Sequence, residues 1–294
     1  MMEYLKAIIL GIVQGATEFL PVSSSGHLSV FQHFMGLSGD GSLQLTVFLH
    51  IGTLVAVIAV YYKTFWKLIK EIGKTIGEFF TRKLDTKHVS DDRHMLYMMF
   101  ISCIPLLFLF IPVGGGQSLK DLVEGLANDS DILVEGFCFL TTAILLLTGA
   151  RAARTKKNIR PMVEGKDAWW VGVAQLAAAA FPGISRSGST IATGMLRGVN
   201  KDYMVEYSFV LGTPAVLAAA VLEIKDALEG GAMALEIGPI IVGIIVAAVV
   251  GVAAIKLLEW LVNKDKFQFF GYYCLIISAA VILAATYEKI VGIN

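Results

Sequence analysis

A carboxylate, several hydroxyls and an imidazole cluster near the start of the chain. The set comprises Gln14, Glu18, Ser23, Ser24, Ser25 and His27. Residues four apart share one face of a helix, so Gln14 and Glu18 would point the same way. We expect Glu18 to hold a cation or to orient an attacking group. The nucleophile would be either Ser24, with His27 as its base, or His27 itself. Gln14, Ser23 and Ser25 would contact the substrate.

A second loop, residues 182–190, reads Pro-Gly-Ile-Ser-Arg-Ser-Gly-Ser-Thr and differs from the first in charge. Its small residues allow backbone N–H groups to be exposed at a helix N-terminus, where the helix dipole also favours an anion. The guanidinium of Arg186 forms a fork that can bind two phosphate oxygens at once. We therefore predict an anion clamp in which Arg186 is a catalytic residue. The substrate-binding residues of this loop would be Gly183, Ser185, Ser187, Gly188 and Thr190.

These groups also have purely structural interpretations. Serine-rich turns allow membrane helices to pack closely. Arg186 could be a cationic anchor at the membrane surface, although it lies well inside its loop. Glu18 and Arg186 could form an ion pair that joins the two loops, which would not exclude catalysis. Other histidines, including His50 at the start of an apolar segment, are expected mainly to cap helices or to face solvent.

Long apolar segments must position these loops. Apolar residues make up 56% of the 294 positions and charged residues 16%, and the mean hydropathy is +0.70. A soluble domain has roughly 45–50% apolar and about 25% charged residues. Six segments approach the length of about 20 residues that a bilayer core requires. They are residues 44–62, 96–113, 132–150, 203–222, 237–258 and 268–287.

The charge and the cysteines agree with a membrane protein. The net charge of zero provides no basic field for nucleic acid, so the lipid bilayer is the expected partner. Cys103, Cys138 and Cys274 all lie in apolar segments. An odd number of thiols in lipid argues against disulfide bonds, and we expect these side chains to act as small apolar groups.

The distribution of Lys and Arg predicts the orientation of the six spans. Residues 63–95 contain eight of them and residues 151–167 contain six, whereas 114–131 and 223–236 contain one each. Cationic segments stay on the cytoplasmic side. Because rich and poor segments alternate, both termini are predicted on the outer side. Within residues 65–80, apolar side chains recur at helical spacing between lysines, which fits either an amphipathic helix on the inner surface or a solvated helix.

Three short segments recur in the same order, which indicates an internal repeat. The matched pairs are 11–14 with 172–175, 19–26 with 181–188 and 51–54 with 211–214, at offsets of 161, 162 and 160 residues. One duplication would explain all three and divides the chain into residues 1–150 and 151–294. Each copy holds one loop region followed by three spans. Since three is odd, the second copy must be inverted relative to the first.

The loop regions interrupt helices that are too short to span a bilayer. Ala7–Phe19 and Val171–Phe181 are each followed by proline and glycine or serine. Broken helices at membrane depth occur only where protein or a water-filled cavity surrounds them. We therefore predict two re-entrant helical hairpins that enter from opposite sides. The expected fold is an all-α polytopic membrane protein with an inverted-topology repeat, six transmembrane helices and the two hairpins.

Both loops resemble those of a known family, the bacterial undecaprenyl pyrophosphate phosphatases of the bacitracin-resistance type. The resemblance rests on residues 14–27, Gln-Gly-Ala-Thr-Glu-Phe-Leu-Pro-Val-Ser-Ser-Ser-Gly-His, and on residues 182–188. It extends over the whole chain in length, number of spans and duplication. The family's first motif has Glu or Gln, three residues, and then Glu. This chain has Gln14, which weakens any scheme with two carboxylates on one metal.

The resemblance implies that undecaprenyl diphosphate is hydrolysed to inorganic phosphate and the monophosphate carrier used in cell-wall synthesis. It also implies a divalent cation, Mg²⁺ or Ca²⁺, for which Glu18 would be the ligand. The location implied is the bacterial cytoplasmic (inner) membrane, with the site open to the outer face.

Two alternatives come from other classes. The inverted repeat would also suit a transporter that flips polyprenyl phosphate, and the two activities could coexist. Lipid phosphatases with a Ser-Gly-His motif need a later histidine, and none follows Arg186. The sequence does not specify an oligomeric state, and a homo-oligomer is compatible with it.

Overall fold

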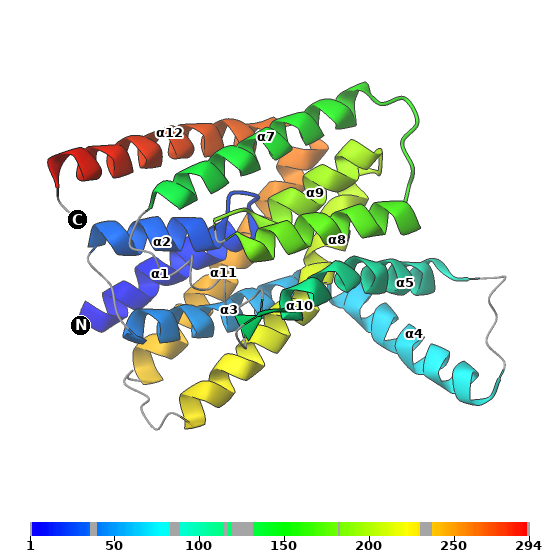
Figure 1. Ribbon diagram of the computed structural model, residues 1–294. Coiled ribbons are helices and arrows are strands. Elements are labelled where there is room, and N and C mark those ends of the chain that lie inside the picture. The colour runs from blue at the N-terminus through cyan, green and yellow to red at the C-terminus, as the bar shows by residue number, and fades with distance from the viewer. Residues whose placement is uncertain are drawn as a thin grey trace.

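The computed structural model describes residues 2–35, 40–82, 89–114, 117–118, 132–181, 183–229 and 237–292, which are mostly helical (Figure 1). The helices are α1 (Met2–Phe19), α2 (Ser24–Met35), α3 (Asp40–Val60), α4 (Tyr62–Phe80), α5 (Asp91–Cys103), the 3-10 helix η1 (Ile104–Phe110), α7 (Leu133–Thr155), α8 (Gly165–Ala180), α9 (Arg186–Arg197), α10 (Lys201–Glu229), α11 (Ile237–Asn263) and α12 (Gln268–Val291). Strands β1 (Pro112–Gly114) and β2 (Gln117–Ser118) form one short antiparallel pair.

Several of these helices can cross a membrane. Among the described residues, four are long and apolar enough: α5 continued by η1, α7, α11 and α12. Helices α3 and α4 pass the same test only as a pair, and the chain bends by 85° between them. The prediction of a polytopic helical membrane protein is confirmed.

The detailed layout of six spans and two re-entrant hairpins stays a prediction. The segment predicted at 203–222 lies inside α10, which is not among the candidate spans found in the described part of the chain. The segment predicted at 44–62 reaches the bend between α3 and α4. The two segments poor in Lys and Arg, 114–131 and 223–236, lie largely outside the described residues.

Close packing between α1 and α11 depends on small residues that face each other. A Cβ atom added to Gly11 would lie 2.9 Å from the carbonyl oxygen of Gly243, and one added to Gly15 would lie 2.6 Å from that of Ala247. Small residues at this four-residue spacing allow membrane helices to approach closely. Helix α11 also packs on α3, and α1 contacts α3 as well, so these three helices form one packed group.

The second hairpin, α8 and α9, is fixed at its base by a charged network. The side chain of Asp167 is fully buried and accepts hydrogen bonds from Arg160 at 3.0 Å and from Arg197 at 2.9 Å. Burial opposes the ionisation of Asp167, but these hydrogen bonds hold its pKa below the usual value. Asp167 and Glu164 also cap α8 reciprocally. The ends of both helices are therefore tied to the segment before α8.

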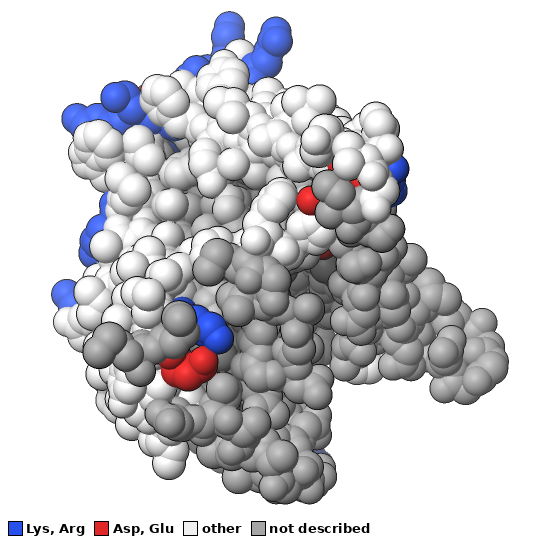
Figure 2. All heavy atoms as spheres, turned by 90° about the vertical axis from the view of Figure 1, so that its left-hand side faces the viewer, with Lys and Arg blue, Asp and Glu red and all other residues white. Residues whose placement is uncertain are grey.

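The cysteines have the structural role expected of them. Cys138 and Cys274 are buried, Cys103 is partly buried, and all three are free thiols. Both ends of the chain lie at the same end of the bundle (Figure 1). Viewed onto that end, the described atoms are mostly uncharged, with Lys and Arg gathered near the upper and left edges (Figure 2).

Candidate active site

The two predicted loops share the same side-chain cap. Ser23 Oγ accepts a hydrogen bond from the N–H of Gly26 at 3.2 Å, and Ser185 Oγ accepts one from Gly188 at 3.0 Å. Each serine therefore caps the helix that follows it. The two helices, α2 and α9, are both 12 residues long. Such capped N-termini direct unpaired backbone N–H groups and the positive end of the helix dipole towards an anion.

The two loops also touch each other, and glycines make this contact possible. The N–H of Gly183 donates to Ser25 Oγ at 3.2 Å. A Cβ added to Gly26 would lie 3.2 Å from Gly183 Cα, and one added to Gly188 would lie 3.1 Å from the Pro21 carbonyl oxygen. Gly183 has a φ of 107°, which side chains rarely permit. The glycines predicted to bind substrate thus bring the two loops together.

A polar cavity opens between the loops, and we call it the serine pocket. It is lined by Thr17, Glu18, Ser23, Ser24, Ser25, Ala178, Ile184, Ser185, Arg186 and Ser187. Ser23 adopts a φ of 73°, in the left-handed region that non-glycine residues seldom occupy. Strained backbone of this kind often occurs at functional sites. The predicted serines of both loops, Glu18 and Arg186 therefore share one cavity.

Glu18 is the centre of the hydrogen-bond network in this pocket. Its Oε2 accepts from Ser24 Oγ at 2.7 Å and from Gln14 Nε2 at 3.1 Å. Its Oε1 accepts from Arg186 Nη2 at 3.0 Å. The ion pair between the two loops is confirmed, and Gln14 lies on the same helix face as Glu18, as predicted. The Ser24 hydroxyl is thus already bonded to a group that can take its proton.

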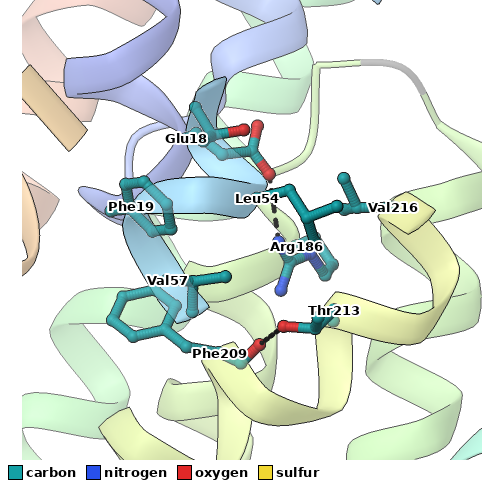
Figure 3. A pocket seen from close by; sticks show the side chains of 10 residues that line it. Glu18, Phe19, Leu54, Val57, Arg186, Phe209, Thr213 and Val216 are labelled. Atoms are coloured by element: carbon teal, nitrogen blue, oxygen red, sulfur yellow. Dashed lines mark hydrogen bonds and ion pairs between the residues drawn. The ribbon is translucent and has the colours of Figure 1, made fainter. Parts of the chain in front are cut away.

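Arg186 is held by α10 on its other side. Its Nη1 donates to the Ser208 carbonyl oxygen at 3.3 Å. A Cβ added to Gly212 would lie only 1.9 Å from Nη1, so the guanidinium occupies the space that any larger side chain would fill. Figure 3 shows Arg186 between Glu18 and this part of α10. The position of the predicted clamp therefore depends on a residue that carries no functional group.

A second, smaller pocket borders the same ion pair, and we call it the apolar pocket. Apolar side chains from three helices form most of its wall (Figure 3). They are Phe19, Leu54, Val57, Phe209 and Val216. Glu18 and Arg186 thus lie between a polar cavity and an apolar one.

Two predicted side chains, those of His27 and Thr190, line neither pocket and contact other groups. The Nδ1 of His27 is 2.7 Å from the Ser23 carbonyl oxygen, and its Nε2 is 2.7 Å from the Tyr273 hydroxyl. Its ring stacks on Tyr273, and His27 lines neither pocket. Thr190 donates to the Arg186 carbonyl oxygen at 2.9 Å and contacts the Ser208 hydroxyl, so it supports α9 from behind. The structure does not bring these two side chains to Ser24.

Three further residues belong to the site but were not predicted there. His50 Nε2 is 3.9 Å from Glu18 Oε2, and Ser208 and Gly212 hold Arg186. A signal was present in the sequence, because the third repeated segment contains Gly-Thr in both copies. Its threonines, Thr53 and Thr213, both line the apolar pocket. The repeated Gly-Thr segment thus indicated which parts of α3 and α10 lie beside the loops.

The donors present suit a cation that is shared with a phosphate group. Across the described residues, no cluster of three or more His, Cys, Asp or Glu side chains could hold an ion by itself. Glu18 is a single carboxylate, and Gln14 Oε1 is buried without a hydrogen-bond partner among the described groups. Mg²⁺ is commonly held by one or two carboxylates together with phosphate oxygens and water. These residues therefore fit a cation that arrives with its substrate.

The fold and the site together define an integral membrane protein with a polar pocket between two capped helices. The chain belongs to the family of the bacitracin resistance protein BacA, whose model matches residues 7–280. It is 39% identical over 282 residues to the undecaprenyl-diphosphatase of Alkaliphilus metalliredigens, covering 96% of this chain and 98% of that protein. It is 37% identical over 284 residues to that of Halothermothrix orenii, covering 97% and 99%. The family resemblance that the two loops indicated is thus confirmed, and it extends over nearly the whole chain.

Proposed function

We propose that this chain is a membrane phosphatase that hydrolyses undecaprenyl diphosphate to undecaprenyl phosphate and inorganic phosphate. The observation that carries the proposal is the position of Glu18, which contacts both the Ser24 hydroxyl and the Arg186 guanidinium. A nucleophile, a base and an anion clamp are thereby combined in one pocket. The undecaprenyl-diphosphatases to which the chain is similar act on a substrate of this chemistry.

In the mechanism that this geometry supports, Ser24 Oγ attacks the terminal phosphorus while Glu18 accepts the serine proton. The bond from that phosphorus to the bridging oxygen breaks, and undecaprenyl phosphate leaves. Water then attacks the phosphoserine, Glu18 returns its proton to Ser24 Oγ, the second water proton goes to solvent, and inorganic phosphate forms. Arg186 and the N–H groups of α9 stabilise the charge on the phosphate oxygens throughout.

A covalent phosphate on His27 is the competing mechanism. The geometry favours Ser24, because Ser24 donates to Glu18 whereas both ring nitrogens of His27 are engaged by Ser23 and Tyr273. The purified protein should be mixed with substrate, quenched within one turnover and analysed by mass spectrometry under acidic and basic conditions. We expect an acid-stable phosphate on Ser24. An acid-labile phosphate on His27 would contradict this assignment.

We further propose that Mg²⁺ or Ca²⁺ binds together with the diphosphate, with Glu18 as its protein ligand. Such a cation neutralises phosphate charge and so makes the terminal phosphorus easier to attack. Phosphate release should fall when a chelator is added and should recover when the metal is restored in excess. Unchanged turnover in chelator, in protein freed of metal, would remove the cation from the proposal.

The fold supports the proposal that residues 1–150 and 151–294 are inverted repeats. Helices α2 and α9 start 162 residues apart, at 24 and 186, and have the same length and the same cap. Corresponding elements pair across the halves: α3 packs on α10, and α7 packs on α12. We propose six spans, two re-entrant hairpins and both termini on the outer side of the cytoplasmic membrane.

A transporter that flips polyprenyl phosphate is not favoured, because the relatives compared above are undecaprenyl-diphosphatases. The two functions can be separated in detergent micelles, where there are no sides to cross. Purified wild-type protein should release phosphate there from undecaprenyl diphosphate. Failure to do so, combined with movement of the lipid in sealed vesicles, would favour the transporter.

A further inference from the structure

Helix α4 projects from the bundle beside α5 (Figure 1), after the 85° bend that separates it from α3. It is held firmly along one face. Arg93 of α5 is buried, and its Nε donates to Glu71 at 2.7 Å while its Nη1 lies 2.8 Å from Glu78. The Thr64 hydroxyl donates to Glu206 of α10. The direction of α4 is therefore set by ion pairs and hydrogen bonds.

The other faces of α4 carry two separate stripes. One stripe is apolar, and its large side chains are 45–79% exposed. It consists of Tyr62, Trp66, Ile69, Ile72, Ile76, Phe79 and Phe80. The second stripe consists of Lys63, Lys67, Lys70 and Lys74, which are all exposed. Spacings of three and four residues keep each stripe on one side of the helix.

The charges of α4 are sorted between its faces. Both of its acidic residues, Glu71 and Glu78, contact Arg93, and Glu78 also lies 3.9 Å from Lys74. The exposed charged residues of Tyr62–Phe80 are all lysines. Lys70 lies 5.1 Å from the centre of the Trp66 ring, where the basic stripe meets the apolar one. A water-soluble helix would not expose a continuous apolar stripe of this length.

We propose that α4 lies in the bilayer interface and binds anionic phospholipids. Its apolar stripe would enter the acyl region, and its lysines would contact the headgroups. Helices that lie in the plane of a membrane combine large apolar and cationic faces in this way. The 85° bend provides the geometry, since a helix that follows a span at nearly a right angle runs along the surface. Anionic lipids of the cytoplasmic leaflet attract lysines near the surface.

Quenching of Trp66 fluorescence tests this proposal in the full chain. The other three tryptophans, Trp169, Trp170 and Trp260, are replaced by Phe, and the protein is placed in lipid nanodiscs. Brominated phosphatidylglycerol and brominated phosphatidylcholine are compared at equal mole fraction. Both lipids should quench Trp66, because its ring would lie at the level of the acyl chains. The anionic lipid should quench it several-fold more strongly. Phosphate release by each variant shows that it is folded.

Two matched sets of variants separate charge from shape. Replacement of Lys63, Lys67, Lys70 and Lys74 by Gln should abolish the preference for the anionic lipid but keep the quenching. Replacement of the same four by Arg should keep both. Equal quenching of wild-type α4 by the two lipids would overturn the proposal, as would an absence of quenching by either. Quenching only in nanodiscs that hold a single copy would assign this face to a second copy of the chain and would equally overturn it.

Discussion

Glu18 accepts hydrogen bonds from two kinds of group in the serine pocket. The Ser24 hydroxyl donates to one carboxylate oxygen, and the Arg186 guanidinium donates to the other. The Arg186 contact keeps the carboxylate ionised and oriented, and an ionised carboxylate can accept the Ser24 proton. A bound phosphate would compete with Glu18 for Arg186. We expect substrate binding to change the partner of Arg186, which would leave Glu18 a stronger base towards Ser24.

Replacement of either reactive group should abolish most of the turnover. We expect Ser24→Ala and Glu18→Gln each to reduce phosphate release at least about a hundredfold, the scale of general base and electrostatic contributions. Arg186→Ala should have an effect of similar size. Thr148→Ala, which removes an exposed hydroxyl on α7, is the control and should leave the rate unchanged. Near-normal release by folded Ser24→Ala would disprove its role as the nucleophile.

Gly212 provides a test of how closely the clamp must be placed. A methyl group there would collide with the Arg186 guanidinium, 1.9 Å from the added Cβ. Gly212→Ala should lower kcat by on the order of a hundredfold, because displacement by about 1 Å can cost that much. Gly73→Ala, at a position with nothing within 4 Å, is the matched control.

The variant Arg186→Lys separates an effect of Gly212→Ala on the position of the guanidinium from an effect on folding, because the lysine side chain is shorter and unbranched at its end. In a background of Arg186→Lys, the further effect of Gly212→Ala should be much smaller than in the wild type. Additive effects of the two substitutions would show that Gly212 acts through α10 itself and not through the guanidinium.

At the scale of helices, the site is built from short, capped pieces whose ends are fixed by separate interactions. Ser23 and Ser185 fix the starts of α2 and α9, and the Asp167 network fixes the base of the second hairpin. The buried Asp167 carboxylate satisfies Arg160 and Arg197 at once. Loss of this network would release the hairpin that carries Arg186.

The stability of this hairpin should depend on pH in the acid range. The folded pKa of Asp167 lies below its unfolded value, near 3.8, so its contribution is fully present above that value. It is lost as the pH falls through the folded pKa. The temperature of the wild-type thermal midpoint should therefore decrease when the pH is lowered below about 4. Asp167→Asn should lower the free energy of unfolding at pH 7 by about 1–3 kcal/mol, and the thermal midpoint with it. The variant should also lose this acid dependence. An identical acid profile in both proteins would contradict the assignment.

The sequence predicted the residues within each loop well, but it predicted contacts between helices that are distant in the sequence poorly. Glu18, Ser24 and Arg186 were identified because their chemistry is concentrated in short loops. Gly212 was not, because its role exists only where α10 crosses the Arg186 side chain. His27 was expected to act with Ser24, yet its ring nitrogens contact the Ser23 carbonyl oxygen and the Tyr273 hydroxyl instead. The break between α3 and α4 was predicted to within a few residues, because 44–62 and 65–80 were read as separate elements and the chain turns at Tyr61, but the 85° angle was not.

For the molecule as a whole, orientation in the membrane is the property that connects the two loops to their proposed roles. Both termini lie at one end of the bundle, and the segment between α7 and α8 lies at the other (Figure 1). That segment is exposed and cationic at Lys156 and Lys157. The rule that cationic segments remain inside the cell would place it in the cytoplasm.

Labelling of single cysteines tests this orientation. In a background without the native cysteines, a membrane-impermeant maleimide should label Glu3→Cys in intact spheroplasts. Lys157→Cys should be labelled only after permeabilisation, and inside-out vesicles should give the reverse pattern. Both positions are exposed in the fold, so failure to label reports sidedness and not burial. Labelling of both from the same side would disprove the proposed topology.

The contact between Ser25 and Gly183 means that neither half of the chain encloses the serine pocket alone. If the halves arose by duplication, an ancestor with one copy could have formed such a pocket only by pairing with a second copy inserted upside down. Both loops would then have carried the same residue at the positions now occupied by Ser24 and Arg186. Fusion into one polypeptide would have removed that constraint, so that a nucleophile and a cation could evolve on opposite walls.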